Sequence, residues 1–178
     1  MIVRAGVACT LFPSFKKGIV DTSLVAMIRR GKAPRLGQWS LPGGRVEWGE
    51  ALAEGAKREV MEEISLSAAS ITVQLIQPSV YSFATTDAIH INENFHYIIA
   101  HVLAFVDCGD SVTPIPLRAG DDAVDATWVR VNDDDNKISE SPPYPTLSSL
   151  NAGSQVMSVI KLAQLLVKSR IPDNQQLT

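Results

Sequence analysis

Hydrophobic positions along the chain cluster into short runs, separated by polar segments that contain Gly, Pro and Asp. Runs rich in Val, Ile, Leu, Thr and aromatic residues predict β-strands. These runs are residues 2–12, 20–30, 71–83, 95–106 and 123–131. We expect the first two to form a hairpin around a turn at 13–18. The polar segment 84–94 predicts a loop.

Two further segments have the composition or the spacing of α-helices. Residues 51–64 carry Ala, Leu, Glu, Lys, Arg and Met at most positions, and all of these favour helices. From 154 to 169 apolar residues recur every three or four positions, which predicts an amphipathic helix. Together with the strands, the helices predict an α/β fold in which a mixed sheet lies between helices. We expect one domain over residues 1–170 and a disordered tail at 171–178.

The first predicted helix carries negative charge on one face. Glu59, Glu62 and Glu63 stand at i, i+3 and i+4, which places three carboxylates about one turn apart. Like charges at this spacing cost a helix about 0.2–0.5 kcal/mol per pair, and Gly55 costs about 1 kcal/mol relative to Ala. Either this face is solvated and partly neutralised by Arg58, or it binds a hard divalent cation, which prefers oxygen ligands.

The segment before this helix favours the cation. Trp39-Ser40-Leu41-Pro42-Gly43-Gly44 is a short apolar run that ends in a Pro-Gly-Gly turn. Two successive glycines let the backbone bend sharply and approach a ligand without a Cβ in the way. The turn and the helix therefore predict one site, with free backbone groups at one end and clustered carboxylates along the next element.

These residues and their spacing resemble a known family signature, that of the Nudix hydrolases. It reads Gly, five residues, Glu, seven residues, then Arg-Glu-aliphatic-any-Glu-Glu-any-Gly-aliphatic. The matching positions here are Gly44, Glu50, Arg58, Glu59, Val60, Glu62, Glu63 and Leu66. Ser65 stands where the family has Gly, just past the helix, where a left-handed C-cap is normal. Either Ser65 adopts that conformation with some strain or the helix ends differently.

The resemblance implies a Nudix-type α/β/α sandwich and a metal site. Glu59, Glu62 and Glu63 would hold Mg²⁺, or alternatively Mn²⁺, helped by the Gly43 carbonyl. The metal would activate a water that attacks phosphorus.

The resemblance also assigns supporting roles around this metal. Gly44, Glu50 and Arg58 would orient the carboxylate helix. Asp122, from an acidic turn at 119–122, is our choice for a further carboxylate or the catalytic base, with Asp121 and Asp125 as neighbours that would substitute for it. Glu62 and Glu59 are the other bases, and an Asp-rich turn that merely caps a strand is the alternative.

A basic loop at 31–38 is expected to border the nucleotide pocket, as it does in similar proteins. This position gives Arg29, Arg30 and Arg35 a role with phosphates or with the terminal ribose, and solvation is the alternative for each. Trp39 either stacks on a base or packs in the core behind the turn.

The segments 95–100 and 119–128 also look like the subgroup described as ADP-ribose pyrophosphatases. This likeness implies that ADP-ribose is cleaved to AMP and ribose 5-phosphate. One alternative is a (d)NTP pyrophosphohydrolase of the nucleotide-sanitising type. Another is a non-catalytic sensor of a nucleotide or ADP-ribose. Because every signature carboxylate is present, we favour the enzyme.

Composition narrows the class of partner and the cellular compartment. The formal charge of −3 and a pI near 5.6 argue against a duplex-binding surface, which needs clustered Lys and Arg. No apolar run reaches the roughly 18 residues that a membrane span needs. We therefore expect a cytoplasmic protein whose partner is a small nucleotide, with no nucleic acid and no membrane. The sequence leaves a homodimer open.

The cysteines and the histidines of the strand runs give no metal site. Cys9 and Cys108 lie far apart, without metal-ligand spacing, and are expected to be reduced thiols. His96 and His101 are five residues apart, which places them on opposite faces of a regular strand. We expect each histidine to be packed or hydrogen-bonded rather than to share a metal.

Overall fold

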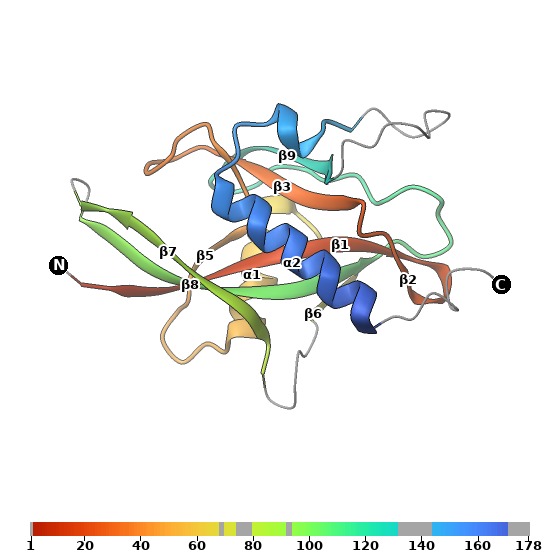
Figure 1. Cartoon of the computed structure of the whole chain (residues 1–178), viewed down its shortest axis with the longest axis horizontal. Coiled ribbons are helices and arrows are strands. Elements are labelled where there is room, and N and C mark those ends of the chain that lie inside the picture. Colours follow the sequence, from red (N-terminus) through yellow and green to blue (C-terminus); the bar gives the residue numbers. More distant parts are fainter. Residues whose placement is uncertain (1, 68–69, 74–79, 92–93, 132–143, 171–178) are drawn as a thin grey trace.

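The computed structural model describes residues 2–67, 70–73, 80–91, 94–131 and 144–170 (Figure 1). The predicted tail at 171–178 lies outside these residues. The described strands are β1 (Arg4–Phe15), β2 (Ile19–Val20), β3 (Leu24–Arg30), β4 (Trp39–Ser40), β5 (Gly43–Arg45), β6 (Ile71–Val73), β7 (Ser82–His90), β8 (Phe95–Asp107) and β9 (Ala123–Arg130). The described helices are α1 (Leu52–Ile64), α2 (Ser154–Arg170) and the short 3-10 turns η1 (Lys16–Gly18) and η4 (Leu147–Ser149).

The strands form two sheets. In the larger sheet β1 pairs antiparallel with β2 and β5 and parallel with β8, along most of its length. Strand β8 also pairs antiparallel with β6 and with β7. The smaller sheet has the order β4-β3-β9 and is antiparallel. The larger sheet is therefore mixed, as the sequence predicted.

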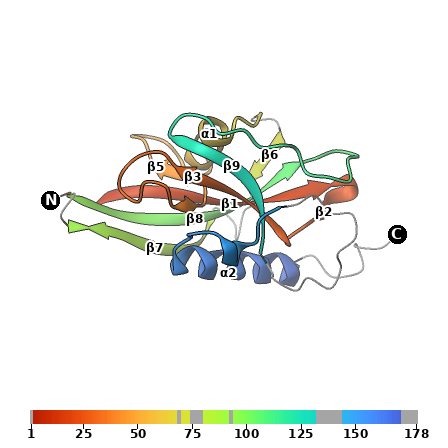
Figure 2. The same cartoon turned by 90° about the horizontal axis from the view of Figure 1, so that it is seen from above.

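Both faces of the strands are covered by helices, as Figure 2 shows for α1 and α2. On β1, Val7, Cys9 and Leu11 belong to the core that includes α1, whereas Ala8 and Phe12 belong to the core that includes α2. Because successive residues of a strand point to opposite faces, a sheet buried on both sides needs apolar residues at nearly every position. This explains the continuous apolar run at the start of the chain and confirms the α/β/α sandwich.

The predicted hairpin between 2–12 and 20–30 is wrong beyond its first residues. Strand β1 continues through Phe15 and pairs with β2 only at Ser14–Val20 and Phe15–Ile19. Asp21 then forms a turn in which its Oδ1 accepts hydrogen bonds from the Ser23 backbone N–H at 2.8 Å and from the Ser23 hydroxyl at 2.6 Å. After this turn the chain enters β3, which belongs to the smaller sheet.

The predicted loop at 84–94 and the predicted strand at 71–83 also need correction. Strand β6 covers Ile71–Val73, residues 74–79 lie outside the described residues, and β7 extends over Ser82–His90 and pairs with β8 through almost its whole length. Its polar content suggested a loop, but Thr85, Thr86 and Ile89 are β-branched and fit a strand. Strand β7 keeps its polar residues because it pairs on one side only within the described chain.

Helix α1 lies where the sequence predicted it, and its ends are defined by polar contacts. At its start, Glu54 Oε2 accepts a hydrogen bond from the Ala51 backbone N–H at 3.0 Å. At its end, Ser65 takes the left-handed conformation, with φ 52° and ψ 36°, and its N–H donates to the Met61 carbonyl. The C-cap therefore forms as in the signature, with a residue that has a Cβ.

The cysteines and the helices agree with the expectations from sequence. Cys9 and Cys108 are both free and buried, as predicted. In the described part of the chain no helix has the length and apolar content that crossing a membrane requires.

Candidate active site

Helix α1 is held against the sheet by one apolar stripe. Ala56, Val60 and Ile64 lie at i, i+4 and i+8 and are fully buried. Gly55 lies beside this stripe, where an added Cβ would be only 2.9 Å from Glu50 Oε2. The close approach of Glu50 therefore explains why a glycine, which weakens the helix, stands at position 55.

Arg58 organises the acidic residues of this region. Its Nε and Nη2 donate to the two carboxylate oxygens of Glu50 at 2.8 and 3.0 Å, a bidentate pair. Its Nη1 donates to Glu59 Oε1 at 2.8 Å and to Glu62 Oε2 at 3.1 Å, and Nη2 also donates to the Arg45 carbonyl at 2.9 Å. All five guanidinium N–H groups thus have acceptors. The neighbouring carboxylates, Glu50 first, hold the pKa of Arg58 above the ordinary value.

Glu63 lies deeper than the other carboxylates and is 5% exposed. Burial raises the pKa of Glu63 to about 8, although its Oε2 accepts a hydrogen bond from the Gly43 backbone N–H at 2.8 Å. Burial also raises the pKa of Glu59, against the opposing effect of Arg58. These carboxylates therefore lie in a place that favours a compensating positive charge.

The Gly-Gly turn comes directly against these carboxylates. Residues Gly43 and Gly44 pair with Ala8 and Val7 of β1, which fixes the turn beside the sheet. A Cβ on Gly44 would overlap the carboxylate of Glu59. An alanine at position 44 would therefore push the Glu59 carboxylate aside.

Asp122 reaches the same region from a distant part of the chain. The Gly120 N–H donates to the Glu63 carbonyl at 2.9 Å, so the loop before β9 is bonded to the last turn of α1. The Gly31 N–H donates to the Asp122 carbonyl at 2.7 Å, and the Asp122 carboxylate forms an ion pair with Lys32. These bonds bring the acidic turn and the basic loop together at the carboxylate helix.

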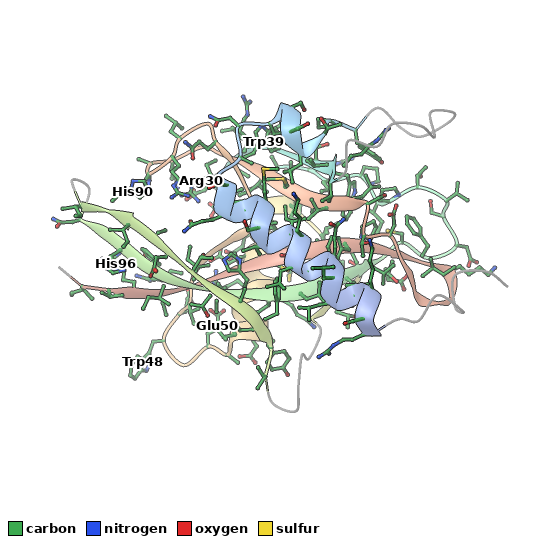
Figure 3. The ribbon with its side chains drawn as sticks, in the orientation of Figure 1. Arg30, Trp39, Trp48, Glu50, His90 and His96 are labelled. Carbon is green, nitrogen blue, oxygen red and sulfur yellow. The ribbon has the colours of Figure 1, made fainter. Side chains whose placement is uncertain are left out.

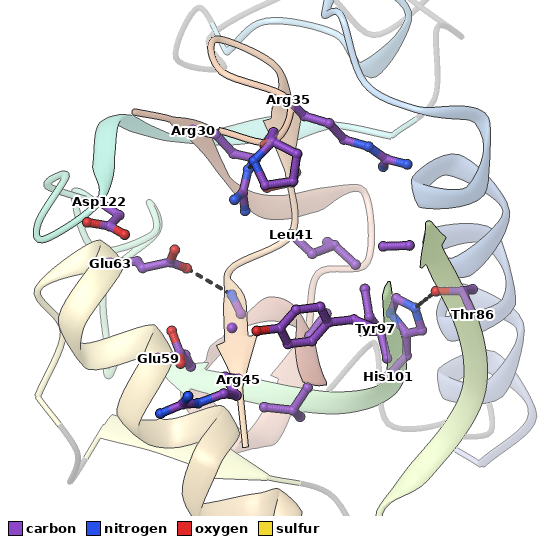
Figure 4. Close-up of a pocket in the computed structure, with 18 of the residues that line it drawn as sticks. Arg30, Arg35, Leu41, Arg45, Glu59, Glu63, Thr86, Tyr97, His101 and Asp122 are labelled. Carbon is purple, nitrogen blue, oxygen red and sulfur yellow. Dashed lines mark hydrogen bonds between the residues drawn. The ribbon is translucent and has the colours of Figure 1, made fainter. Parts of the chain in front are cut away.

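A pocket of about 470 Å³ connects these groups. Figure 4 shows Glu59, Glu63 and Asp122 at one end and Thr86 and His101 at the other, with Tyr97 between them and Arg30 and Arg35 along one edge. The cationic side chains that line the pocket are Arg30, Lys32, Arg35, Arg45 and Arg58. Acidic and basic walls around one cavity suit a polyanionic ligand together with a divalent cation.

The structure separates the predicted substrate-binding residues into two groups. Arg30 and Arg35 line the pocket, where Arg35 Nε donates to His90 Nε2 at 3.1 Å across from the loop to β7. Arg29 and Trp39 do not line it. Trp39 packs with the core on the α2 side (Figure 3), and its backbone N–H donates to the Asn151 carbonyl at 3.1 Å.

Several pocket residues escaped the sequence analysis, namely Arg45, Thr86, Tyr97 and His101. Tyr97, Ile99 and His101 alternate along β8, so a period of two identifies them as one face of that strand. Thr86 was hidden because its segment was predicted to be a loop.

The donor set at the acidic end fits a hard divalent cation, since it consists of carboxylates beside a backbone turn. As the side chains lie, Glu59 and Glu62 both turn toward Arg58 Nη1. Within the described ranges no three His, Cys, Asp or Glu residues converge closely enough to hold a metal. Glu62 is the more exposed of the two, at 45% against 12% for Glu59, so its side chain has more room to turn toward a cation.

The chain is similar to a protein family, to one curated relative and to several solved structures. The family model described as NUDIX domain matches residues 4–147. A stretch of 53 residues, 30% of the chain, is 40% identical to 16% of the 8-oxo-dGDP phosphatase NUDT18 of Danio rerio. The chain thus spans a small part of that relative.

Two solved structures share the fold over most of their length. The Nudix hydrolase RenU of M. smegmatis has a TM-score of 0.64 at 17% identity, over 97% of this chain and 90% of that one. The NUDIX domain of Shewanella oneidensis NrtR, solved with ADP ribose, has a TM-score of 0.59 at 15% identity, over 94% of this chain and 90% of that one.

Proposed function

The chain belongs to the Nudix family of hydrolases, and we propose that it cleaves the pyrophosphate bond of ADP-ribose, giving AMP and ribose 5-phosphate. Membership makes the chain an enzyme that acts on nucleoside diphosphate derivatives. The choice of ADP-ribose rests on the layout of the pocket. It joins clustered carboxylates, several cationic side chains and an apolar end within one cavity.

Each part of the pocket suits one part of this substrate. Arg30 and Arg35 offer positive charge to the two phosphates or to the terminal ribose. Apolar lining residues such as Leu41, Ile99 and Val156 suit a flat base. The solved NUDIX domain with ADP ribose supports the proposal, because its fold extends over most of this chain.

We propose that Glu59, Glu62 and Glu63, with the Gly43 carbonyl, hold Mg²⁺ or Mn²⁺. When bound, the cation neutralises pyrophosphate charge and lowers the pKa of the attacking water. Water forms a new bond to one phosphorus while the bond from that phosphorus to the bridging oxygen breaks. A carboxylate takes the proton of the water, and the leaving phosphate departs with the bridging oxygen.

The chain's own residues prepare this step in three ways. Arg58 orients Glu59 and Glu62 through one nitrogen and keeps Glu50 against the helix. Lys32 holds Asp122 at the acidic end through their ion pair. Asp122, Glu62 and Glu59 are the three carboxylates proposed for the proton transfer.

A second candidate function follows from the 8-oxo-dGDP phosphatase relative. The matched stretch is short, but it favours a modified nucleoside di- or triphosphate over a sugar-linked one. The same carboxylates would serve, and the reaction would belong to a nucleotide-sanitising role. With either substrate we propose that the partner is a small nucleotide and that the protein is cytoplasmic, and a homodimer is left open.

Product identification distinguishes these functions. Purified protein is incubated with Mg²⁺ and ADP-ribose, NADH, diadenosine polyphosphates, nucleotide sugars, or normal and oxidised nucleotides, and products are separated by chromatography. We expect AMP to appear fastest from ADP-ribose. Faster release of pyrophosphate or phosphate from an oxidised nucleotide would replace ADP-ribose by the second candidate. Tight binding of one ligand without turnover would indicate a sensor.

A further inference from the structure

Polar atoms without a hydrogen-bond partner concentrate at the pocket. Within the residues that the structure describes, four buried side-chain atoms lack such a partner: Thr10 Oγ1, Ser40 Oγ, His101 Nδ1 and Asp122 Oδ1. Asp122 Oδ1 nevertheless forms the ion pair with Lys32, and Thr10 does not line the pocket, whereas Ser40 and His101 do. Because a buried polar atom without a partner costs about 1–3 kcal/mol, such atoms indicate where a ligand supplies the missing bond.

His101 is the most informative of these residues, because it lies far from the carboxylates. It is 5% exposed, on the face of β8 that also carries Tyr97 and Ile99. Its Nε2 is 2.7 Å from the Thr86 hydroxyl on the neighbouring strand β7, which fixes the plane of the ring. The other ring nitrogen, Nδ1, is buried and has no hydrogen-bond partner within the described residues. His101 lines the pocket.

Burial lowers the pKa of His101 to about 4, so the imidazole is neutral near neutral pH. A neutral imidazole has one donor nitrogen and one acceptor nitrogen. It therefore offers a polar contact without a charge. Phosphate groups are better served by Arg30 and Arg35 at the pocket edge, whereas His101 suits an uncharged heteroaromatic ring.

The surroundings of His101 suit such a ring in shape as well. The pocket that His101 lines also has apolar side chains in its wall: Ala8, Leu41, Ala88, Ile99 and Val156. Figure 4 shows His101 and Thr86 at the end opposite Glu59 and Glu63, with Leu41 between the two ends. An apolar slot with a few placed polar groups is the usual form of a site for a flat ligand.

We propose that His101, held by Thr86, binds the edge of the nucleobase of the substrate and sets base preference, with Ser40 as a second polar contact. This assignment rests on the proposed function, since it takes the ligand to be a nucleotide. It places the base at the β7–β8 end and the pyrophosphate between the arginines and the carboxylates of α1.

Binding of nucleoside monophosphates without a divalent metal tests this assignment directly. The probes are AMP, GMP, CMP and UMP, measured by isothermal titration calorimetry in EDTA. We expect the wild type to prefer one base, and we expect His101→Phe to weaken binding of that nucleotide about tenfold and to compress the differences between bases. His101→Asn keeps a donor and an acceptor, and we expect it to recover part of the preference.

His96→Phe is the matched control, because His96 lies on the same strand but does not line the pocket. Figure 3 shows it on the part of β8 that projects beyond α2. We expect this variant to bind all four probes as the wild type does. Thr86→Val removes the hydroxyl that orients the ring, and we expect a smaller loss with the same compression. If His101→Phe does not fold, as judged by circular dichroism, His101→Asn and Thr86→Val decide the question.

Two outcomes overturn the assignment. One is a wild type that binds the four nucleotides equally. The other is a set of His101 and Thr86 variants in which the ratios between bases stay within about twofold of the wild type. Failure of the proposed function looks different. In that case the wild type hydrolyses none of the substrates, while base preference in EDTA still depends on His101.

Discussion

Replacing Glu63 by Gln should change how stability depends on pH in protein freed of divalent metal. Burial raises the pKa of Glu63 from 4.5 to about 8, with further contributions from the charges of Glu59 and Asp122, while the Gly43 N–H and Arg30 oppose the shift. The native state therefore keeps a proton that the unfolded chain releases. Between about pH 4.5 and pH 8 the free energy of unfolding falls as the pH rises.

The size of this effect follows from the same two values. A pKa difference of one unit corresponds to about 1.4 kcal/mol, so the full interval sets an upper limit of about 5 kcal/mol. We expect about 2–3 kcal/mol, because the ionised carboxylate can turn toward water in the pocket. The glutamine side chain has no charge to bury, so the advantage of Glu63→Gln over the wild type should grow by that amount between about pH 5 and pH 8.5.

Urea unfolding in EDTA, followed by circular dichroism across this pH range, measures the difference. Glu54→Gln is the control, since Glu54 is exposed on the same helix and the substitution likewise exchanges a carboxylate for an amide. Adding Mg²⁺ should restore wild-type stability at high pH and should have little effect on Glu63→Gln. Parallel stability curves for Glu63→Gln and the wild type would refute the assignment of a buried, charge-penalised carboxylate.

Three other substitutions test the geometry around the carboxylates. In Arg58→Lys the lysine side chain has fewer hydrogen-bond donors and cannot form the bidentate pair with Glu50. This variant should therefore lower the free energy of unfolding by about 2 kcal/mol in urea titrations and reduce turnover about tenfold. Ser65→Gly should raise the free energy of unfolding by about 0.5–1 kcal/mol and leave turnover unchanged, because the left-handed C-cap no longer carries a Cβ. Gly44→Ala should lower Mn²⁺ affinity at least about tenfold in a titration, since the new Cβ overlaps Glu59, whereas Gly153→Ala meets no close atom and should bind as the wild type does.

The parts of the site that depend on local sequence were predictable. Helical geometry alone places Glu59, Glu62 and Glu63 on one face, and the structure has a helix at these residues. The contact of Arg58 with Glu62 follows from helical spacing. Its bidentate partner is Glu50, which lies before the helix and is brought back by the turn at the helix start.

The parts that depend on strand pairing were not predictable from local pattern. Strand β7 contains enough polar residues to look like a loop, and only its pairing with β8 places Thr86 beside His101. Arg29 and Arg30 are adjacent in sequence, yet only Arg30 lines the pocket; Arg29 is exposed, and the register between β3 and β9 shifts between the two residues. Which face meets the pocket is set by the partner strands.

Turnover of Glu62→Gln in Mg²⁺ is the most direct test of the central claim that α1 carboxylates hold the cation used in hydrolysis. Glu62 is nearly half exposed and contacts Arg58 at 3.1 Å, so the substitution should change the free energy of unfolding by about 1 kcal/mol at most. With the substrate that the wild type cleaves fastest, we expect kcat to fall about 100-fold or more. A Glu62→Gln enzyme that stays folded and turns over within about threefold of the wild type would contradict the metal assignment.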